Sequence, residues 1–156
     1  MIKVDIPGVG NLHLKHLVLD YNGTIAFDGS LISGVKEQLN QLAGDINIYI
    51  ITADTFGTVR QKCRNIKGEI KVLNSSNGAL EKETFVASLG AAHVVAIGNG
   101  VNDNLMLKKV ALGIAVIGGE GAAQITLKEA DIVVKNIHSA LELLLNPLRL
   151  IATLRS

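Results

Sequence analysis

The sequence predicts a single α/β domain, a three-layer Rossmann-like arrangement in which helices cover a central parallel sheet. Of the 156 residues, 48% are hydrophobic and only 3% are aromatic. Short aliphatic runs of this kind are typical of parallel strands that are buried on both faces. These runs alternate with helical segments through short connections, which favours right-handed crossovers between neighbouring strands. A chain of this length is expected to form one domain over residues 1–156.

The aliphatic runs give the order of the strands. Residues 1–13 alternate weakly around Pro7-Gly8-Val9-Gly10, a pattern that predicts a short hairpin or an extended arm. Residues 23–29 are typical of a loop, in which Phe27-Asp28-Gly29 indicates a turn and a small flap. Strands are predicted at 16–19, 46–51, 69–73, 94–97, 113–117 and 131–134.

Helices are predicted between the strands. Ser33 is a suitable N-cap for a helix that continues through Leu42 and ends at Gly44. The segment 136–156 forms a closing helix, leucine-rich over 141–154, which Pro147 is expected to kink or interrupt. The other predicted helices cover 55–66, 79–89, roughly 102–110 and a stretch that ends near residue 130.

Composition excludes several classes of protein. The net charge of +1, without a marked Lys/Arg cluster, argues against nucleic-acid binding. The apolar runs are shorter than the roughly 18 residues needed to cross a bilayer, and residues 1–14 do not resemble a signal peptide. Cys63 is the only cysteine, so it is interpreted as a structural thiol without a disulfide partner in the chain. We therefore expect a cytoplasmic protein that binds neither nucleic acid nor membrane.

Polar residues follow the predicted strands at three places. Asp20 follows the strand at 16–19, Thr52 follows the strand at 46–51, and the loop Gly98–Asp103 follows the strand at 94–97. Open parallel sheets bind ligands beyond the carboxyl ends of their strands. These residues are therefore expected to converge on one site, which Lys82, early in its helix, can reach.

The residues at this edge suit phosphoryl transfer. Asp20 is the candidate nucleophile, because a carboxylate can form an aspartyl phosphate. Lys82 can neutralise both Asp20 and the phosphoryl group, and Thr52 offers it a hydroxyl and an amide. Amides of the turn at 22–24 can form a small anion nest. The predicted phosphate-binding residues are Gly23, Thr24, Thr52, Ala53 and Lys82.

A magnesium ion is the expected cofactor, because phosphoryl transfer commonly uses one and Mg²⁺ prefers oxygen ligands. Asp20 and Asp103 would supply two carboxylates, Asn99 a neutral oxygen and Asn22 a backbone carbonyl. Removing a negative charge beside a divalent ion weakens its binding by an amount on the order of a few kcal/mol. The ion is therefore expected to bind loosely.

Taken in order, these residues resemble the four motifs of the haloacid dehalogenase superfamily of phosphohydrolases. The similarity is greatest to the phosphorylation domain of P-type ATPases and runs from about His16 to Leu145. Asp20-Tyr21-Asn22-Gly23-Thr24 is similar to their Asp-Lys-Thr-Gly-Thr site, and Thr52-Ala53-Asp54 to their Thr-Gly-Asp motif. Residues 98–103 are similar to Gly-Asp-Gly-Val-Asn-Asp, with Asn99 as the difference.

The resemblance implies a small member without a cap domain. Only about thirty residues separate Asp20 from Thr52, and about thirty separate Thr52 from Lys82, which leaves room for loops and single elements. The chain cannot hold the membrane and nucleotide-binding parts of a pump. An open site of this kind implies a phosphorylated substrate that is bulky or macromolecular, or a homo-oligomer in which the N-terminal arm or C-terminal helix closes the site.

Two asparagines limit the chemistry that the resemblance implies. Phosphatases of this superfamily carry an acid/base aspartate at the position of Asn22, which the resemblance places in the catalytic site. An asparagine can neither protonate a leaving group nor activate water. Loss of general acid–base catalysis costs about 10²- to 10⁴-fold in rate. Three interpretations stay open: a weak Mg²⁺-dependent phosphatase that favours activated phosphates, a regulatory protein that binds phosphate or Mg²⁺, and a catalytically dead scaffold for protein contacts.

Overall fold

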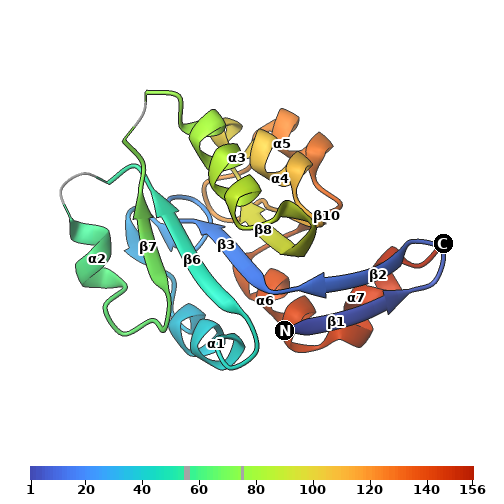
Figure 1. The fold of residues 1–156 in the computed structure, drawn as a ribbon. Helices are drawn as coiled ribbons and strands as arrows, with labels where there is room; N and C mark the ends of the chain where they lie inside the picture. Colours follow the sequence, from blue (N-terminus) through green and yellow to red (C-terminus); the bar gives the residue numbers. More distant parts are fainter. Residues whose placement is uncertain (55–56, 75) are drawn as a thin grey trace.

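The computed structural model describes residues 1–54, 57–74 and 76–156. Its centre is a six-stranded parallel sheet in the order β10-β9-β8-β3-β6-β7 (Figure 1). All six strands that the aliphatic runs predict are present. They are β3 (His16–Asp20), β6 (Asn47–Thr52), β7 (Glu69–Val72), β8 (Val94–Gly98), β9 (Leu112–Val116) and β10 (Ile132–Val134).

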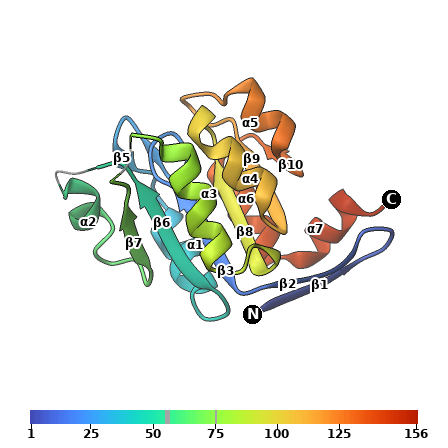
Figure 2. The same ribbon diagram turned by 45° about the horizontal axis from the view of Figure 1, so that its top comes forward.

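Helices cover both faces of this sheet, which confirms the predicted three layers. The helices α3, α4 and α5 pack on one face, and α1 and α6 cover the other (Figures 1 and 2). Side chains of β3 alternate between the two cores: Val18 packs with the α3–α4 layer, whereas Leu17 and Leu19 pack with the α1–α6 layer. The helices are α1 (Val35–Leu42), α3 (Gly78–Ser88), α4 (Asn104–Lys109), α5 (Gln124–Glu129) and α6 (Ile137–Leu145).

A hairpin outside the sheet carries the N-terminal residues. Strands β1 (Ile2–Ile6) and β2 (Gly10–Leu14) pair antiparallel, and helix α7 (Pro147–Leu154) lies along them (Figure 1). Of the two forms predicted for residues 1–13, the hairpin is therefore the one that occurs. The contact is apolar, with Val4 and Ile6 of β1 and Leu150 of α7 all buried.

No cap domain interrupts the described chain. Between β3 and β6 lie only α1 and the flap formed by β4 (Ala26–Phe27) and β5 (Ser30–Leu31). The flap turns at Asp28 and Gly29, whose positive φ values of 48° and 72° suit a tight two-residue hairpin turn. Between β6 and β7 the described residues form only the short helix α2 (Thr58–Lys62).

Two predicted helix boundaries differ from the structure. Ser33 does not cap α1; Gly34 is the N-cap instead, at a φ of 85° that glycine adopts readily, and no side chain caps the helix. The predicted helix 55–66 is shorter, since α2 begins at Thr58 and ends at Lys62; its positions 55 and 56 lie outside the described residues. The closing helix is interrupted at Pro147, as expected: Pro147 occupies the first turn of α7 and separates it from α6.

Across the three described stretches, no helix combines the length and the apolar character that a bilayer crossing requires.

Candidate active site

The predicted site residues gather at the carboxyl edge of the sheet. Asp20 ends the central strand β3, and its register partner on β6 is Ile51, so Thr52 lies one residue further along the neighbouring strand. On the other side of β3, Gly98 ends β8 and leads into the loop that carries Asn99 and Asp103. A parallel sheet therefore brings together side chains that are up to 83 positions apart, the separation of Asp20 and Asp103 (103 minus 20).

Lys82 connects the two carboxylates of the site. Its Nζ atom lies 2.6 Å from Oδ1 of Asp20 and 2.6 Å from Oδ1 of Asp103. Lys82 and Asp103 are fully buried, and Asp20 is 8% exposed. The second oxygen of Asp103 accepts hydrogen bonds of 2.9 Å from the amides of Asn99 and Gly100. Buried charges are tolerated when they are paired and hydrogen-bonded in this way.

When Asp20 is ionised, these three residues carry one net negative charge in a buried environment. Burial first, and the Asp103 carboxylate second, raise the pKa of Asp20 to about 7, while Lys82 acts in the opposite direction. Burial disfavours the charged form of Lys82, but Asp20 and Asp103 outweigh it and raise the pKa of Lys82 above its usual value. Lys82 therefore stays charged, and Asp20 becomes an anion, the form a nucleophile requires, only around neutral pH.

The loop after Asp20 is held by its own backbone. The amide of Gly23 donates to the carbonyl of Ala26 at 3.0 Å, and the amide of Thr24 donates to the carbonyl of Tyr21 at 3.3 Å. Two of the three amides expected in an anion nest thus already have partners within the loop. Asn22 is exposed, whereas Gly23 and Thr24 are buried.

The hydroxyl of Thr24 makes a contact that its predicted role did not include. Its Oγ1 donates to Oδ1 of Asn99 at 3.1 Å and lies 3.4 Å from Oδ2 of Asp20. The side chain therefore links the first and the last motif of the site. Sequence reasoning assigned Thr24 a backbone role, and no local pattern indicates a partner 75 residues away.

The Thr52–Asp54 segment divides into a part that faces the site and a part that supports it. Thr52 is buried, and its Oγ1 accepts a 3.1 Å hydrogen bond from the amide of Asp54, so its hydroxyl proton can be donated elsewhere. Oδ2 of Asp54 accepts from the hydroxyl of Thr58 at 2.7 Å and from the amide of Val59 at 2.8 Å. Asp54 thus fixes the start of α2, and Ala53 between them is exposed.

Asn99 makes a contact that an aspartate could not make. Its Nδ2 donates to the carbonyl of Gly121 at 3.0 Å, and its backbone carbonyl accepts from the amide of Ala123 at 2.8 Å. Nearby, Thr126 donates to the carbonyl of Gly100 at 2.6 Å. These bonds attach the loop before α5 to the site. A turn at residues 118–120 leads into this loop, whose attachment to Asn99 was not predicted.

The oxygen atoms around Asp20 are of the kind that Mg²⁺ prefers. Oδ2 of Asp20 and Oδ1 of Asn99 both approach the hydroxyl of Thr24, and Asp103 is joined to Asp20 through Lys82. Three of the four predicted ligands therefore converge. Among the described residues, no group of three His, Cys, Asp or Glu side chains could hold a metal ion. The oxygen donors are of the type that a hard cation prefers, but they carry little negative charge.

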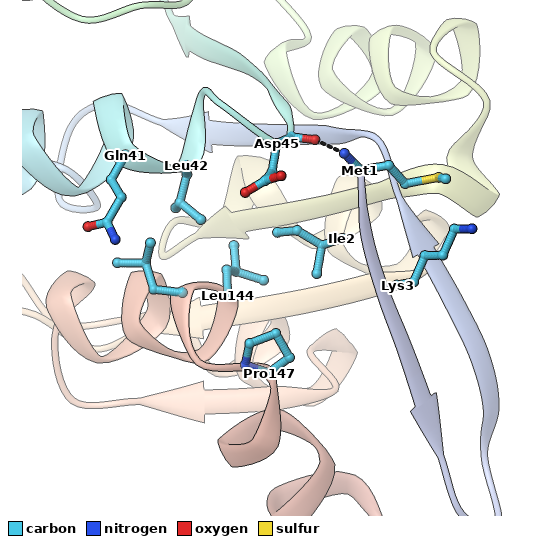
Figure 3. Close-up of a pocket in the computed structure, with 9 residues that line it drawn as sticks. Met1, Ile2, Lys3, Gln41, Leu42, Asp45, Leu144 and Pro147 are labelled. Carbon is cyan, nitrogen blue, oxygen red and sulfur yellow. Dashed lines mark hydrogen bonds between the residues drawn. The ribbon is translucent and has the colours of Figure 1, made fainter.

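One cavity of the protein lies far from the candidate site. It has a volume of about 320 Å³ and lies between the N-terminal hairpin, the end of α1 and the junction of α6 with α7 (Figure 3). Asp45, which lines it, precedes the amino end of β6, at the edge of the sheet opposite Asp20. This cavity therefore takes no part in the candidate site.

Solved structures with the same architecture decide the fold. A 3-deoxy-D-manno-octulosonate 8-phosphate phosphatase from Moraxella catarrhalis, solved with magnesium, phosphate and its sugar acid, is 21% identical, with a TM-score of 0.65 over 92% of this chain and 94% of that one. A putative hydrolase of the haloacid dehalogenase superfamily from Legionella pneumophila is 21% identical, with a TM-score of 0.69 over 90% and 87%. The chain has the haloacid dehalogenase fold.

The catalytic domain of an ATPase is also among the solved structures to which this chain is similar. The catalytic domain of the CPx-ATPase CopB-B is 24% identical, with a TM-score of 0.57 over 74% of this chain and 46% of that one. The predicted fold is therefore confirmed.

Sequence relatives give the chain a narrower family. The uncharacterized protein MJ0073 of Methanocaldococcus jannaschii is 60% identical over 62 residues, which are 40% of this chain and 67% of that protein. The uncharacterized protein MJ0072 of the same organism is 54% identical over 39 residues, which are 25% of this chain and 89% of that protein. The chain belongs to the family of these proteins, and no model of a protein family matches it.

The raised pKa of Asp20 predicts a pH dependence of stability. In the folded state its pKa is about 7, and its ordinary value is 3.8, so between these values the native protein binds more protons than the unfolded chain. The contribution of Asp20 to stability must therefore fall as the pH rises from about 4 to about 7. We expect wild type to lose stability relative to Asp20→Asn over this interval in metal-free urea unfolding. A constant difference between the two proteins would contradict the assignment.

The bond from Asn99 to Gly121 predicts the effect of restoring an aspartate. In Asn99→Asp a carboxylate would face the Gly121 carbonyl, so a hydrogen bond is lost and two acceptors are opposed. The variant should lose about 1–3 kcal/mol in the free energy of unfolding without divalent ions, and Mg²⁺ should restore part of it. Asn102→Asp adds the same charge to an exposed position of the same loop and is the control. Equal stability of Asn99→Asp and wild type without Mg²⁺ would refute the role of the amide.

Proposed function

We propose that this protein is a Mg²⁺-dependent phosphohydrolase that forms an aspartyl phosphate on Asp20 and acts best on activated phosphates. The observation that carries the proposal is the buried bridge of Lys82 between Asp20 and Asp103 at the carboxyl edge of the sheet. A scaffold would gain little from three buried charges at this position, because replacing such groups by apolar side chains is often neutral or stabilising. The phosphatases among the similar structures support the same reaction class.

The first step would transfer the phosphoryl group to Asp20. One oxygen of its carboxylate forms a bond to phosphorus, the bond from phosphorus to the leaving group breaks, and the leaving group keeps the electron pair. Lys82 holds the other carboxylate oxygen at 2.6 Å and offers positive charge to the phosphoryl oxygens. The hydroxyl of Thr52 can donate to the same group.

The second step would release phosphate. Water attacks the phosphorus, the bond to Asp20 breaks, and the carboxylate is regenerated. Asn22 cannot take a proton from this water, just as it cannot give one to the leaving group in the first step. The first step is therefore slow with poor leaving groups such as alcohols. It is less affected with phosphoanhydrides and acyl phosphates, whose leaving groups depart as stable anions. The second step is slow for every substrate, because each gives the same aspartyl phosphate.

Magnesium fits the proposed site as a weakly held cofactor. Asp20, Asp103, the Asn99 amide oxygen and the Asn22 backbone carbonyl would hold the ion, whose charge would offset that of the phosphoryl oxygens. The bond of Asn99 to Gly121 attaches the loop before α5 to the site. Closure of the open edge by a bulky substrate or by a second copy of the chain stays a prediction.

A regulatory role is the second candidate, and Asn22 favours it. Without a group that activates water, phosphate could stay on Asp20 and hold the protein in a phosphorylated state. Acid-quenched protein would then retain close to one phosphate per chain on Asp20 after exposure to an activated phosphate. An enzyme that turns over would retain less than this under the same conditions.

Two substitutions test the proposed reaction. Asp20→Asn should abolish turnover of acetyl phosphate, because the nucleophile is lost. Asn22→Asp should raise turnover of alcohol phosphates by about 10²- to 10⁴-fold, since it supplies the missing acid and base. The measurement is phosphate release at fixed Mg²⁺, with Asn74→Asp, an exposed residue after β7, as the charge control. Turnover that survives in Asp20→Asn, or no gain in Asn22→Asp, would contradict the mechanism.

A further inference from the structure

A separate cavity adjoins the candidate site at Asn22. It has a volume of about 340 Å³ and is formed by the loop after β3, the flap turn, the segment after β6 and helix α2. Two of the residues that line it, Asn22 and Ala53, were already assigned to the site. The lining residues are Tyr21, Asn22, Gly29, Ala53, Asp54, Thr58, Val59 and Lys62. Because Tyr21 and Asn22, the two residues that follow Asp20, line this cavity, it offers room beside the site for a group bonded to a phosphoryl on Asp20.

Lys62 supplies a positive charge to the wall of this cavity. It is the last residue of α2, and its Nζ donates a hydrogen bond to the carbonyl of Gly29 in the flap turn. An ammonium group has three donors, so this bond positions the charge and leaves donors for a ligand. The flap and α2 are thereby joined across the cavity.

Two further cations lie near Lys62 in the sequence. Arg60 and Arg64 lie close to it in sequence and are exposed, and no ion pair in the described part of the chain involves any of the three. The cavity also contains Asp54, but one of its carboxylate oxygens is held by Thr58 and Val59 at the start of α2. An anion in the cavity would therefore face a positioned ammonium group.

This arrangement complements the defect at Asn22. A leaving group that departs without a proton takes the negative charge of the broken bond, and a nearby cation can stabilise that charge where an acid is missing. We infer that the cavity is the leaving-group subsite and that Lys62 stabilises a leaving group that is itself a phosphate, so that phosphoanhydrides are the preferred substrates. The inference rests on the proposed function and adds a substrate class and a specificity-determining residue to it.

The chemical step balances without a further reactant. The carboxylate of Asp20 bonds to the terminal phosphorus of a phosphoanhydride, and the bond from that phosphorus to the bridging oxygen breaks. The bridging oxygen keeps the electron pair and departs as part of a phosphate anion beside Lys62. Water then releases the second phosphate from Asp20.

The test is the ratio of kcat/KM for pyrophosphate to kcat/KM for p-nitrophenyl phosphate, whose leaving group carries no phosphate. Lys62→Gln should lower this ratio by about 10- to 100-fold. This is equal to or somewhat smaller than the loss of rate seen when one charge-stabilising donor is removed from an active site. Lys62→Arg keeps the charge and should retain most of the ratio. Lys67→Gln removes an exposed cation that does not line the cavity and should leave the ratio unchanged. An unchanged ratio in Lys62→Gln would overturn the inference.

Binding separates this inference from the proposed function. If wild type shows no turnover that depends on Asp20, the proposed function fails, and calorimetry with pyrophosphate still tests the subsite. Wild type should then bind pyrophosphate more tightly than Lys62→Gln does, and both should bind inorganic phosphate with similar affinity. Equal affinity of the two proteins for pyrophosphate would overturn the subsite as well. Melting temperatures of the variants verify that they fold.

Discussion

The site is organised around a buried lysine that lies between two carboxylates. Lys82 is 2.6 Å from Asp20 and from Asp103, and it is fully buried, so neither carboxylate could be ionised there at low cost without it. The three residues come from β3, α3 and the loop after β8, so the bridge also depends on the order of strands in the sheet. The pKa of Asp20, raised to about 7, reports how far burial and Asp103 oppose this stabilisation.

The two asparagines then set the limits of the chemistry. At position 99 the amide gives up the charge of a carboxylate and gains a donor, which binds Gly121 and holds the loop before α5. At position 22 the exposed amide cannot transfer a proton, so the leaving group must be stabilised by some other interaction. Lys62, which the carbonyl of Gly29 positions at the neighbouring cavity, can supply an electrostatic interaction with the leaving group. The same site can thus be poor at one class of phosphate ester and suited to another.

The fold and the position of the site could be predicted from the sequence, because strands that are buried on both faces consist of aliphatic runs. The polar residues at their ends, Asp20 and Thr52, must then share one edge of the sheet. The contacts of Thr24 with Asn99 and of Asn99 with Gly121 could not be predicted, since they join loops that only the tertiary structure brings together. The N-cap at Ser33 was wrong because the left-handed turn at Gly34 takes its place.

The most direct test of the account is a thermal melt with and without Mg²⁺ and beryllium fluoride, a mimic of a phosphoryl group on a carboxylate. A ligand that binds only the native state must raise the melting temperature. The account predicts a rise for wild type that needs both ligands for its full extent and that is lost in Asp20→Asn. No rise at high Mg²⁺, or the same rise in Asp20→Asn, would contradict a phosphoryl site at Asp20.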